Sequence, residues 1–192
     1  MKVGLADDHE WMGGASMAQN GVICNPNIPS EEVFTTPHAL RVEGYVSSTK
    51  PLSHQGTLID NIRVVFEKGS ITDAKASKGE TVLKKVLESD EGARRLGEVA
   101  LVPNSSPISN SGLLFYNTLF DENAACHIAL GQCYSKCFKG ETNLSTSEIR
   151  ERGGNSSMIH IDWMIGSGEI DIDGFGKNGE IVPIFRKGEW VD

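Results

Sequence analysis

The sequence predicts an α+β protein, a single domain rich in mixed or antiparallel sheet and containing few helices. Many short segments alternate apolar and polar residues, whereas only one has the clear periodicity of a helix. The strand-like segments follow one another without the regular strand–helix alternation of a parallel sheet. With 192 residues, the chain suits one domain, residues 1–192. A chain of this length can bury roughly 70% of the surface that its unfolded state exposes.

Composition narrows the class of protein. The net charge of −8 argues against a general nucleic-acid binder. We expect no membrane association, because the chain has no apolar run of the roughly 18 residues that a spanning helix needs. Asp7 and Asp8 precede any apolar segment, so the N-terminus does not resemble a signal peptide. We therefore expect a cytoplasmic protein with free cysteines, since none forms a CxxC pair: Cys24, Cys126, Cys133 and Cys137.

The N-terminal half is predicted to consist mainly of strands. Lys68-Gly69 is expected to form the turn of a hairpin, because it separates two alternating segments and ends in glycine. The prolines after residue 25 make the segment before Glu31 irregular. Around a turn region at residues 7–14, the expected strands are residues 2–6, 21–24, 31–35, 39–47, 57–67 and 70–76.

The C-terminal half contains the clearest helix, residues 79–89, because its apolar residues recur at helical spacing. A second helix is expected within residues 117–131, with Asp121 or Asn123 as its N-cap. Residues 139–154 are expected to be a polar loop. The expected strands are residues 96–102, 158–165 and two or three antiparallel strands within 168–191, with turns at 174–176 and at Asn178-Gly179.

Two polar residues interrupt the apolar segment that ends at Gly166. Alternation along a strand places His160 and Asp162 on one face, roughly 7 Å apart, and leaves the isoleucines and Trp163 for the other. A buried carboxylate without a partner is unfavourable, so Asp162 needs a cation, a hydrogen-bond donor or water. The alternatives are a His–Asp hydrogen bond at the end of a sheet and an exposed strand face.

Two further ionisable residues lie in apolar or small-residue surroundings. Glu98 follows a glycine and precedes four apolar residues in a predicted strand. Its alternatives are a solvated edge strand and an ion pair with Arg94 or Arg95. His127 lies among small residues that would let a ligand or another backbone approach closely. Its alternative is a hydrogen-bonded histidine of the core.

The adjacent Glu31 and Glu32 face opposite ways on a strand, so only one can point into a given pocket. Their alternative is a solvated acidic pair, and the default for Tyr134 is core packing. Taken together, the chain offers three carboxylates and two histidines in unusual surroundings. Five such ligands match a two-metal hydrolytic site, in which one carboxylate bridges the two ions.

Four segments together resemble the M29 family of metallo-aminopeptidases, the aminopeptidase T and aminopeptidase S group. They occur in the family's order and show no departure at any ligand position: Asn27–Pro37, Leu96–Val102, Asn117–Gly131 and Ile159–Gly166. Family members are longer than this chain. The resemblance therefore implies the catalytic C-terminal half of a two-domain metallopeptidase, with the family's N-terminal domain absent.

The resemblance also implies a cofactor of two divalent metal ions, Zn²⁺ or Co²⁺, and their ligands. We expect Glu98 to bridge the ions, with two carboxylates on one ion and two histidines on the other. The ligands implied are Glu32, Glu98, His127, His160 and Asp162.

Activity and catalytic residues follow from the same resemblance. It implies hydrolysis of the N-terminal residue from peptides with a free N-terminus, through a metal-activated water. Tyr134 matches a family tyrosine near the metals, where it could donate to an oxyanion. The general base could be Glu31, Glu122 or a ligand carboxylate.

Two other classes of function remain open. One is a different dinuclear metallohydrolase, such as a phosphoesterase, although no basic cluster lies near the ligand segments to hold phosphate. The other is a folded but inactive module that binds a metal or a partner. For the partners, the resemblance implies peptide substrates and a homodimer.

Overall fold

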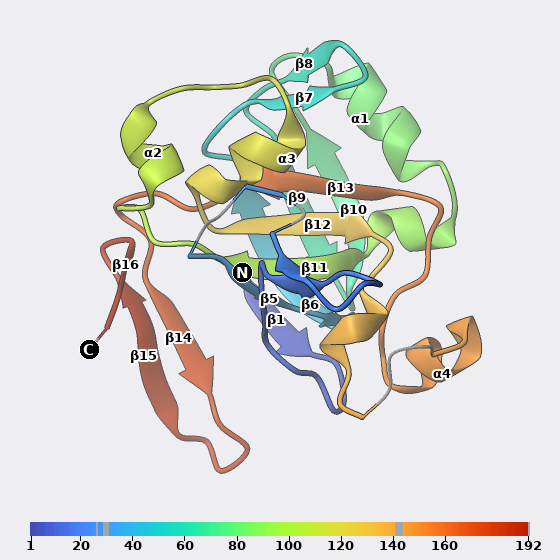
Figure 1. Cartoon of the computed structure of the whole chain (residues 1–192). Helices are drawn as coiled ribbons and strands as arrows, with labels where there is room; N and C mark the ends of the chain where they lie inside the picture. The colour runs from blue at the N-terminus through green and yellow to red at the C-terminus, as the bar shows by residue number, and fades with distance from the viewer. Residues whose placement is uncertain (26, 29–30, 141–143, 192) are drawn as a thin grey trace.

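The computed structural model describes residues 1–25, 27–28, 31–140 and 144–191. Strands outnumber helices within these ranges, and the strand pairs of its sheets are antiparallel (Figure 1). The predicted α+β class is therefore confirmed, with an antiparallel rather than mixed sheet arrangement.

A five-stranded sheet crosses the middle of the molecule in the order β13-β12-β11-β5-β2. Three of its strands confirm predicted ones. The other two correct the prediction, since β12 lies at the end of the segment where we expected a helix and β2 lies within the expected turn region. The five strands are β2 (Met12–Gly13), β5 (Val33–Thr35), β11 (Leu96–Leu101), β12 (His127–Gly131) and β13 (His160–Met164).

A four-stranded sheet lies behind it in the order β1-β6-β9-β10. The hairpin predicted around Lys68-Gly69 is confirmed. Both turn residues have positive φ, 49° and 79°, as a two-residue turn between twisted strands requires. The strands are β1 (Lys2–Leu5), β6 (Pro37–Ser47), β9 (Arg63–Glu67) and β10 (Ser70–Lys75).

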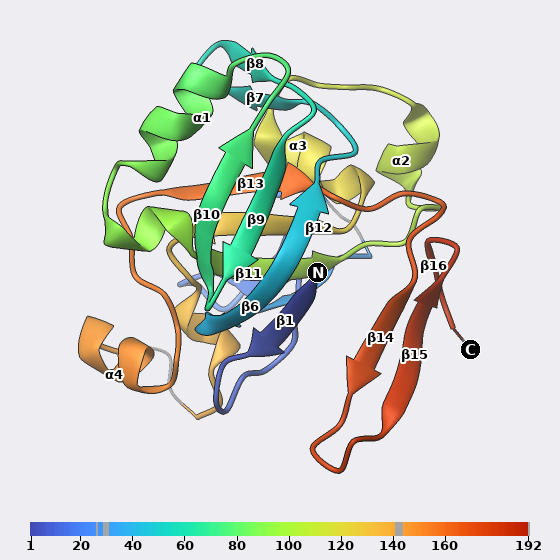
Figure 2. The same cartoon turned by 180° about the vertical axis from the view of Figure 1, so that it is seen from behind.

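Three smaller sheets complete the strand content. The expected strand at 57–67 is in fact two strands, β8 and β9, because β8 turns back at Gln55-Gly56 to pair with β7. The three C-terminal strands form a predicted antiparallel sheet, whose hairpin projects from the body (Figures 1 and 2). These strands are β3 (Ser16–Met17), β4 (Ile23–Cys24), β7 (Leu52–His54), β8 (Thr57–Ile59), β14 (Ile172–Phe175), β15 (Ile181–Arg186) and β16 (Glu189–Trp190).

The helix predicted at 79–89 is confirmed as α1 (Glu80–Leu87), which buries Leu83 and Leu87. The helix expected within 117–131 is shorter than predicted, α3 (Thr118–Asp121), and its N-cap is Asn117 instead of Asp121 or Asn123. The helical turns not predicted are α2 (Pro107–Ser111), α4 (Thr146–Glu151), η1 (Glu91–Arg94), η2 (Glu122–Ala124) and η3 (Ser135–Cys137). No helix among the described residues is long and apolar enough to span a bilayer.

The main hydrophobic core fills the space between the two larger sheets. Figure 2 shows β6, β9 and β10 crossing one face of β11, β12 and β13. The core includes Val64 and Phe66 from β9, Leu87 from α1, and Leu130 and Trp163 from the five-stranded sheet. One face of the five-stranded sheet is thus committed to the core. Its opposite face is left for polar chemistry.

Candidate metal centre

Glu98 reaches the polar face of the five-stranded sheet because β11 contains a bulge. The register with β12 shifts between Leu96 and Glu98, so Gly97 is the extra residue. Leu96 can therefore pack in the core while Glu98 points to the other face. A Cβ on Gly97 would lie 2.5 Å from the carbonyl oxygen of Gly131 and closer still to that of Gln132. Only glycine fits this approach of the two strands.

Strand alternation also places the next three ligand candidates, as predicted for His160 and Asp162 but not for His127, whose segment was expected to include a helix. In β13, His160 and Asp162 share the polar face, whereas Ile161 and Trp163 pack against the core. In β12, His127 takes the polar face and its neighbour Ile128 the core. The three polar side chains therefore project from two adjacent antiparallel strands.

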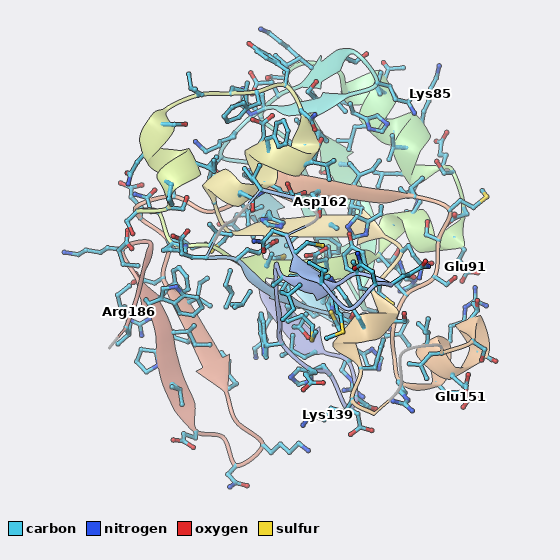
Figure 3. All side chains as sticks on the ribbon, in the orientation of Figure 1. Lys85, Glu91, Lys139, Glu151, Asp162 and Arg186 are labelled. Atoms are coloured by element: carbon cyan, nitrogen blue, oxygen red, sulfur yellow. The ribbon has the colours of Figure 1, made fainter. Side chains whose placement is uncertain are left out.

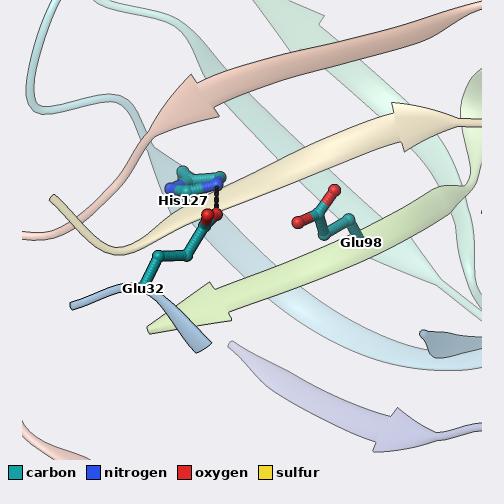
Figure 4. Close-up of side chains that lie close together, drawn as sticks. All are labelled: Glu32, Glu98 and His127. Carbon is teal, nitrogen blue, oxygen red and sulfur yellow. Dashed lines mark ion pairs between the residues drawn. The ribbon is translucent and has the colours of Figure 1, made fainter. Parts of the chain in front are cut away.

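The side chains of Glu31 and Glu32, just before β5, lie in different surroundings. Glu32 approaches the polar face, where its Oε1 lies 3.0 Å from Nε2 of His127 (Figure 4). Glu31 is exposed and belongs to none of the candidate ligand groups of the described chain. The geometry thus supports Glu32 as the member of the pair that faces the centre, and it does not bring Glu31 there.

All five ligand candidates of the sequence converge in space. Their ligand atoms form groups in which every pair lies within 4.8 Å, and Glu98 belongs to two of the groups. Figure 4 shows Glu32, Glu98 and His127 meeting from three segments far apart in the sequence. The groups are Glu32–Glu98–His127, Glu98–His160–Asp162 and Glu122–His127–Asp162.

The grouping of the side chains differs from one expectation. Each of the groups built around Glu98 contains one histidine and one further carboxylate, Glu32 with His127 and Asp162 with His160. We had expected the two carboxylates on one ion and the two histidines on the other. Strand geometry explains the difference, because His160 and Asp162 are neighbours on one face of the same strand.

The structural alternatives for Glu98 do not hold. Only 4% of its surface is exposed, and β11 is a central strand of its sheet. Arg94 donates to the carbonyl of Ile71 and Arg95 to that of Ala39, so neither arginine pairs with this carboxylate.

Glu122 is a member of the cluster that the sequence suggested only as a possible base. It follows α3, is 8% exposed and shares a group with His127 and Asp162. The side-chain amide of Asn27 donates a hydrogen bond to it. No sequence periodicity points to this position, because the turn between α3 and β12 alone brings Glu122 over the sheet.

Both histidines present Nε2 to the carboxylates. Nδ1 of His160 lies 2.6 Å from the carbonyl oxygen of Gln132, and Nδ1 of His127 lies 3.0 Å from that of Ala125. Since a carbonyl only accepts, each Nδ1 must carry the proton. In a neutral ring the Nε2 lone pair then faces carboxylate lone pairs, which is repulsive unless a proton or a metal ion lies between them.

The polar atoms of the centre support this conclusion. Nε2 of His160 lies 3.2 Å from Oε2 of Glu98 and 3.3 Å from Oδ2 of Asp162. Yet this nitrogen and Oδ1 of Asp162 are buried without a hydrogen-bond partner among the described residues. A divalent cation would satisfy both atoms, and mixed nitrogen and oxygen ligation suits zinc or cobalt. The residues present therefore fit a metal centre.

The electrostatics show that the cluster attracts positive charge. Burial would lower the pKa of both histidines, but close carboxylates raise the pKa to about 10 for His127, mainly through Glu32, and to about 11 for His160, mainly through Asp162. Burial, reinforced by the charge of Asp162, raises the pKa of Glu122 to about 8 and that of Glu98 above its usual range. Without cations, the cluster therefore retains protons.

Tyr134 lies beside the centre. Its ring centroid is 4.8 Å from that of His160 and 5.7 Å from that of Phe34. Burial and the negative charge of Glu98 raise the pKa of its hydroxyl, so the group stays a hydrogen-bond donor. Because 40% of the residue is exposed, a ligand entering the centre could reach it.

This chain is similar to known proteins over nearly its whole length. The family described as thermophilic metalloprotease (M29) matches residues 1–190. Aminopeptidase T of Thermus aquaticus is 54% identical over 191 residues, which are 100% of this chain and 46% of that protein. Aminopeptidase AmpS of Bacillus subtilis is 49% identical over 191 residues, covering 100% of this chain and 47% of that protein.

A solved structure agrees with the fold. The wild-type AmpT from Thermus thermophilus superimposes with a TM-score of 0.92 at 53% identity, covering 99% of this chain and 47% of that one. The chain spans about half the length of the curated relatives it matches.

Proposed function

Because this chain belongs to the thermophilic metalloprotease (M29) family, we propose that it forms the catalytic part of a metal-dependent aminopeptidase. The substrates are peptides with a free N-terminus, from which the first residue is hydrolysed. Two divalent cations, Zn²⁺ or Co²⁺, are the cofactors. Relatives that are named aminopeptidase and are 49–54% identical to this chain support this class of reaction, the removal of an N-terminal residue.

One observation carries the proposal: Glu98 is shared by two ligand groups, each with its own histidine and second carboxylate. We assign Glu98 as the bridge, Glu32 and His127 to one cation, and His160 and Asp162 to the other. Four ionised carboxylates, Glu122 included, carry four negative charges, and two divalent cations balance them. Without the cations, protons on the two histidines, Glu98 and Glu122 offset that charge.

When bound, the two cations supply Lewis-acid polarisation of the first peptide carbonyl and a lowered pKa for water. The chain's own residues supply orientation and proton transfer. Glu122 is buried beside His127 and Asp162, where its carboxylate can accept a proton from water or hold the substrate's α-ammonium group. Tyr134 donates a hydrogen bond to the oxyanion of the tetrahedral stage. Glu31 remains the alternative base from sequence reasoning.

The test combines metal content with activity. We expect the chain loaded with Co²⁺ to release p-nitroaniline from leucine p-nitroanilide. The kcat/KM of the Glu98→Gln variant should be lower by at least about 100-fold, because the variant loses the bridging charge. Elemental analysis should find fewer than two ions bound per chain. Glu67→Gln, at the exposed end of β9, is the control and should retain both properties. Full activity in Glu98→Gln would refute the two-metal assignment.

The same assay separates the alternatives. A chain that binds two ions but hydrolyses a phosphoester rather than the anilide would be a phosphoesterase. A chain that binds metal and turns over neither substrate would be a binding module. The homodimer and the cytoplasmic location expected from the sequence stay predictions, which sedimentation and cell fractionation can check.

A further inference from the structure

A groove adjoins the candidate metal centre. Its volume is about 540 Å³, and it lies between α1, the β7–β8 hairpin and the start of β13. His160 lines the groove and also belongs to the Glu98–His160–Asp162 group. Figure 3 labels Lys85 on α1, at the rim of the groove, and Asp162 in the centre of the molecule. A molecule held in the groove would therefore lie next to the centre.

The groove runs beside an open sheet edge. β13 is the outermost strand of its sheet and pairs only with β12. The bonds from Gln132 N–H to the Ile159 carbonyl and from Ile165 N–H to the Cys126 carbonyl fix which residues point at β12. By antiparallel alternation, the N–H and C=O of His160 point outward, toward the edge. Within the described chain, no backbone group is paired with them.

The edge is open at one end only. At the end of β13, the backbone N–H of Thr49 donates to the Met164 carbonyl at 3.0 Å, and its hydroxyl donates to the Gly166 carbonyl at 2.6 Å. At the start of β13, the N–H of Met158 is held by Asp90, but its side chain is 80% exposed. A peptide on this edge can therefore extend past Met158 but not past Met164.

We propose that the groove binds the part of a peptide substrate that follows the scissile bond, as an added strand antiparallel to β13. The inference rests on the proposed function, which puts the substrate's N-terminus at the cations. With the N-terminus there, the closed end at Thr49 stops the chain in one direction, and the open edge at His160 receives it in the other. Peptide backbone is the ligand whose alternating N–H and C=O groups match those of His160.

The lining sets the side-chain preference. Val82 and Val86 of α1 and Ile159 and Ile161 of β13 form apolar walls, while Lys85 lies at the rim. Main-chain pairing is independent of substrate sequence, so the reaction would accept many peptides. The apolar walls would favour an apolar side chain at a position after the scissile bond over an acidic or a glycine residue.

Selective N-methylation of the substrate tests the backbone pairing. In an extended strand, neighbouring amides point to opposite sides. Among tetrapeptides methylated on the amide nitrogen of the third or the fourth residue, one should therefore show a KM raised about three- to tenfold, the loss expected for one hydrogen bond. The other should behave as the parent, and kcat should hardly change. Equal effects at both positions would overturn the proposal.

A second readout needs no turnover. When a Leu-Ala-Leu-Ala analogue whose first peptide bond is reduced, and therefore resists hydrolysis, is added to ¹⁵N-labelled chain loaded with Zn²⁺, the amide proton of His160 should shift downfield and exchange more slowly. The amide of Ile161, already directed at β12, is the internal control and should move little. An unchanged His160 amide at millimolar peptide would overturn the inference even if the enzyme is active.

Matched substitutions test the groove itself. Ser89→Trp, just after α1, should fill the groove and raise KM for tetrapeptides, whereas Thr81→Trp, exposed on α1 and outside the groove, should not. Leucine p-nitroanilide has no residues beyond the bond, so both variants should hydrolyse it like the parent. If the parent chain fails on the anilide, the proposed function fails, while the amide shift of His160 still decides the inference. Unchanged tetrapeptide KM in Ser89→Trp would count against it.

Discussion

The chemistry of this protein depends on where single atoms are held. The carbonyls of Gln132 and Ala125 fix the Nδ1 protons of His160 and His127, so the Nε2 atoms face a group of carboxylates. Either ring alone would be an ordinary hydrogen-bonded histidine. With Glu98 between them, both turn a ring nitrogen toward carboxylate oxygens, an arrangement that requires a proton or a metal ion in between.

Glu122 provides a prediction at this scale. Glu122→Gln should lower kcat by at least about 100-fold while both metal ions remain bound, because a general base contributes on the order of 10²–10⁴ in rate. Glu31→Gln, at an exposed position, should change kcat by less than about threefold, since solvent can replace an exposed carboxylate. The measurement is kcat together with metal content. The reverse order of the two variants would assign the base to Glu31.

At the scale of elements, two local devices aim the ligands. The bulge at Gly97 turns Glu98 out of the core face of β11. Asp90 anchors the entry to β13, since its carboxylate caps η1 through Ala93 N–H and accepts from the Ser157 hydroxyl and Met158 N–H. The bulge lies within β11, and the contacts of Asp90 lie just before β13, so each device acts on a strand that carries candidate ligands.

The bulge predicts the effect of one added methyl group. Gly97→Ala should lower the free energy of unfolding by about 1–3 kcal/mol, because the new Cβ overlaps the Gly131 and Gln132 carbonyls. It should also reduce metal binding, since strands that move apart displace Glu98. Gly14→Ala, where an added Cβ meets nothing within 4 Å, is the control. Urea unfolding and metal titration of both variants measure the difference.

Asp90 predicts a pH-dependent stability. Burial would raise its pKa, but hydrogen bonds from Met158 N–H, Ser157 and Ala93 N–H hold the pKa below its usual value. Its contribution is therefore full above the unfolded pKa of about 3.9 and is lost as the pH falls through the lower folded value. We expect Asp90→Ala to cost about 1–2 kcal/mol near pH 6, with the difference shrinking below about pH 4.

The control for this experiment is Asp73→Ala. Asp73 is exposed and pairs only loosely with Lys75, at 3.8 Å, so its loss should cost under about 0.5 kcal/mol at any pH. Thermal unfolding across the pH range measures both variants. A difference for Asp90→Ala that persists at pH 2 would mean that its effect is not electrostatic.

At the scale of the whole molecule, the sheets divide two tasks. The core between them gives rigidity to one face of the five-stranded sheet, and the candidate ligands occupy its other face. The C-terminal strands join this body through Phe185, which is fully buried against Leu101 and Cys126 and contacts the tilted ring of Trp190. The projecting hairpin is therefore rooted in the folded body.

Because Phe185 is buried in the folded body, we expect the C-terminal strands to unfold together with the rest of the chain. Phe185→Ala should lower the free energy of unfolding by about 3–5 kcal/mol, because it leaves a cavity beneath β11. Phe175→Ala, on the same sheet but 62% exposed, should cost less than about 1 kcal/mol. Near- and far-ultraviolet circular dichroism should report one transition in both variants. A separate low-temperature transition in Phe185→Ala would mean that the C-terminal strands fold independently.

Periodicity alone determined much of the fold. Alternation identified the strands around Glu98 and His160, and helical spacing identified α1, because these local patterns record which face meets the core. Short elements escaped it, since two- to six-residue segments hold too few residues to show a period. The spacing of Ser145 and Glu148 is that of a capping box, which is a sequence signal for the start of α4. This helix was not predicted, because the segment is polar and shows no apolar periodicity.

The sequence by itself singled out candidate metal ligands, because carboxylates and histidines in apolar segments are rare and need partners, and the family resemblance supplied the full set with Glu32. The sequence also determined that His160 and Asp162 share a face, which is a property of any strand. Only the tertiary structure decided that Glu32 reaches His127, that Glu122 joins the cluster, and that Glu98 is common to two ligand groups. These contacts join segments that are far apart in the chain. They depend on a bulge and on strand order, which local periodicity does not encode.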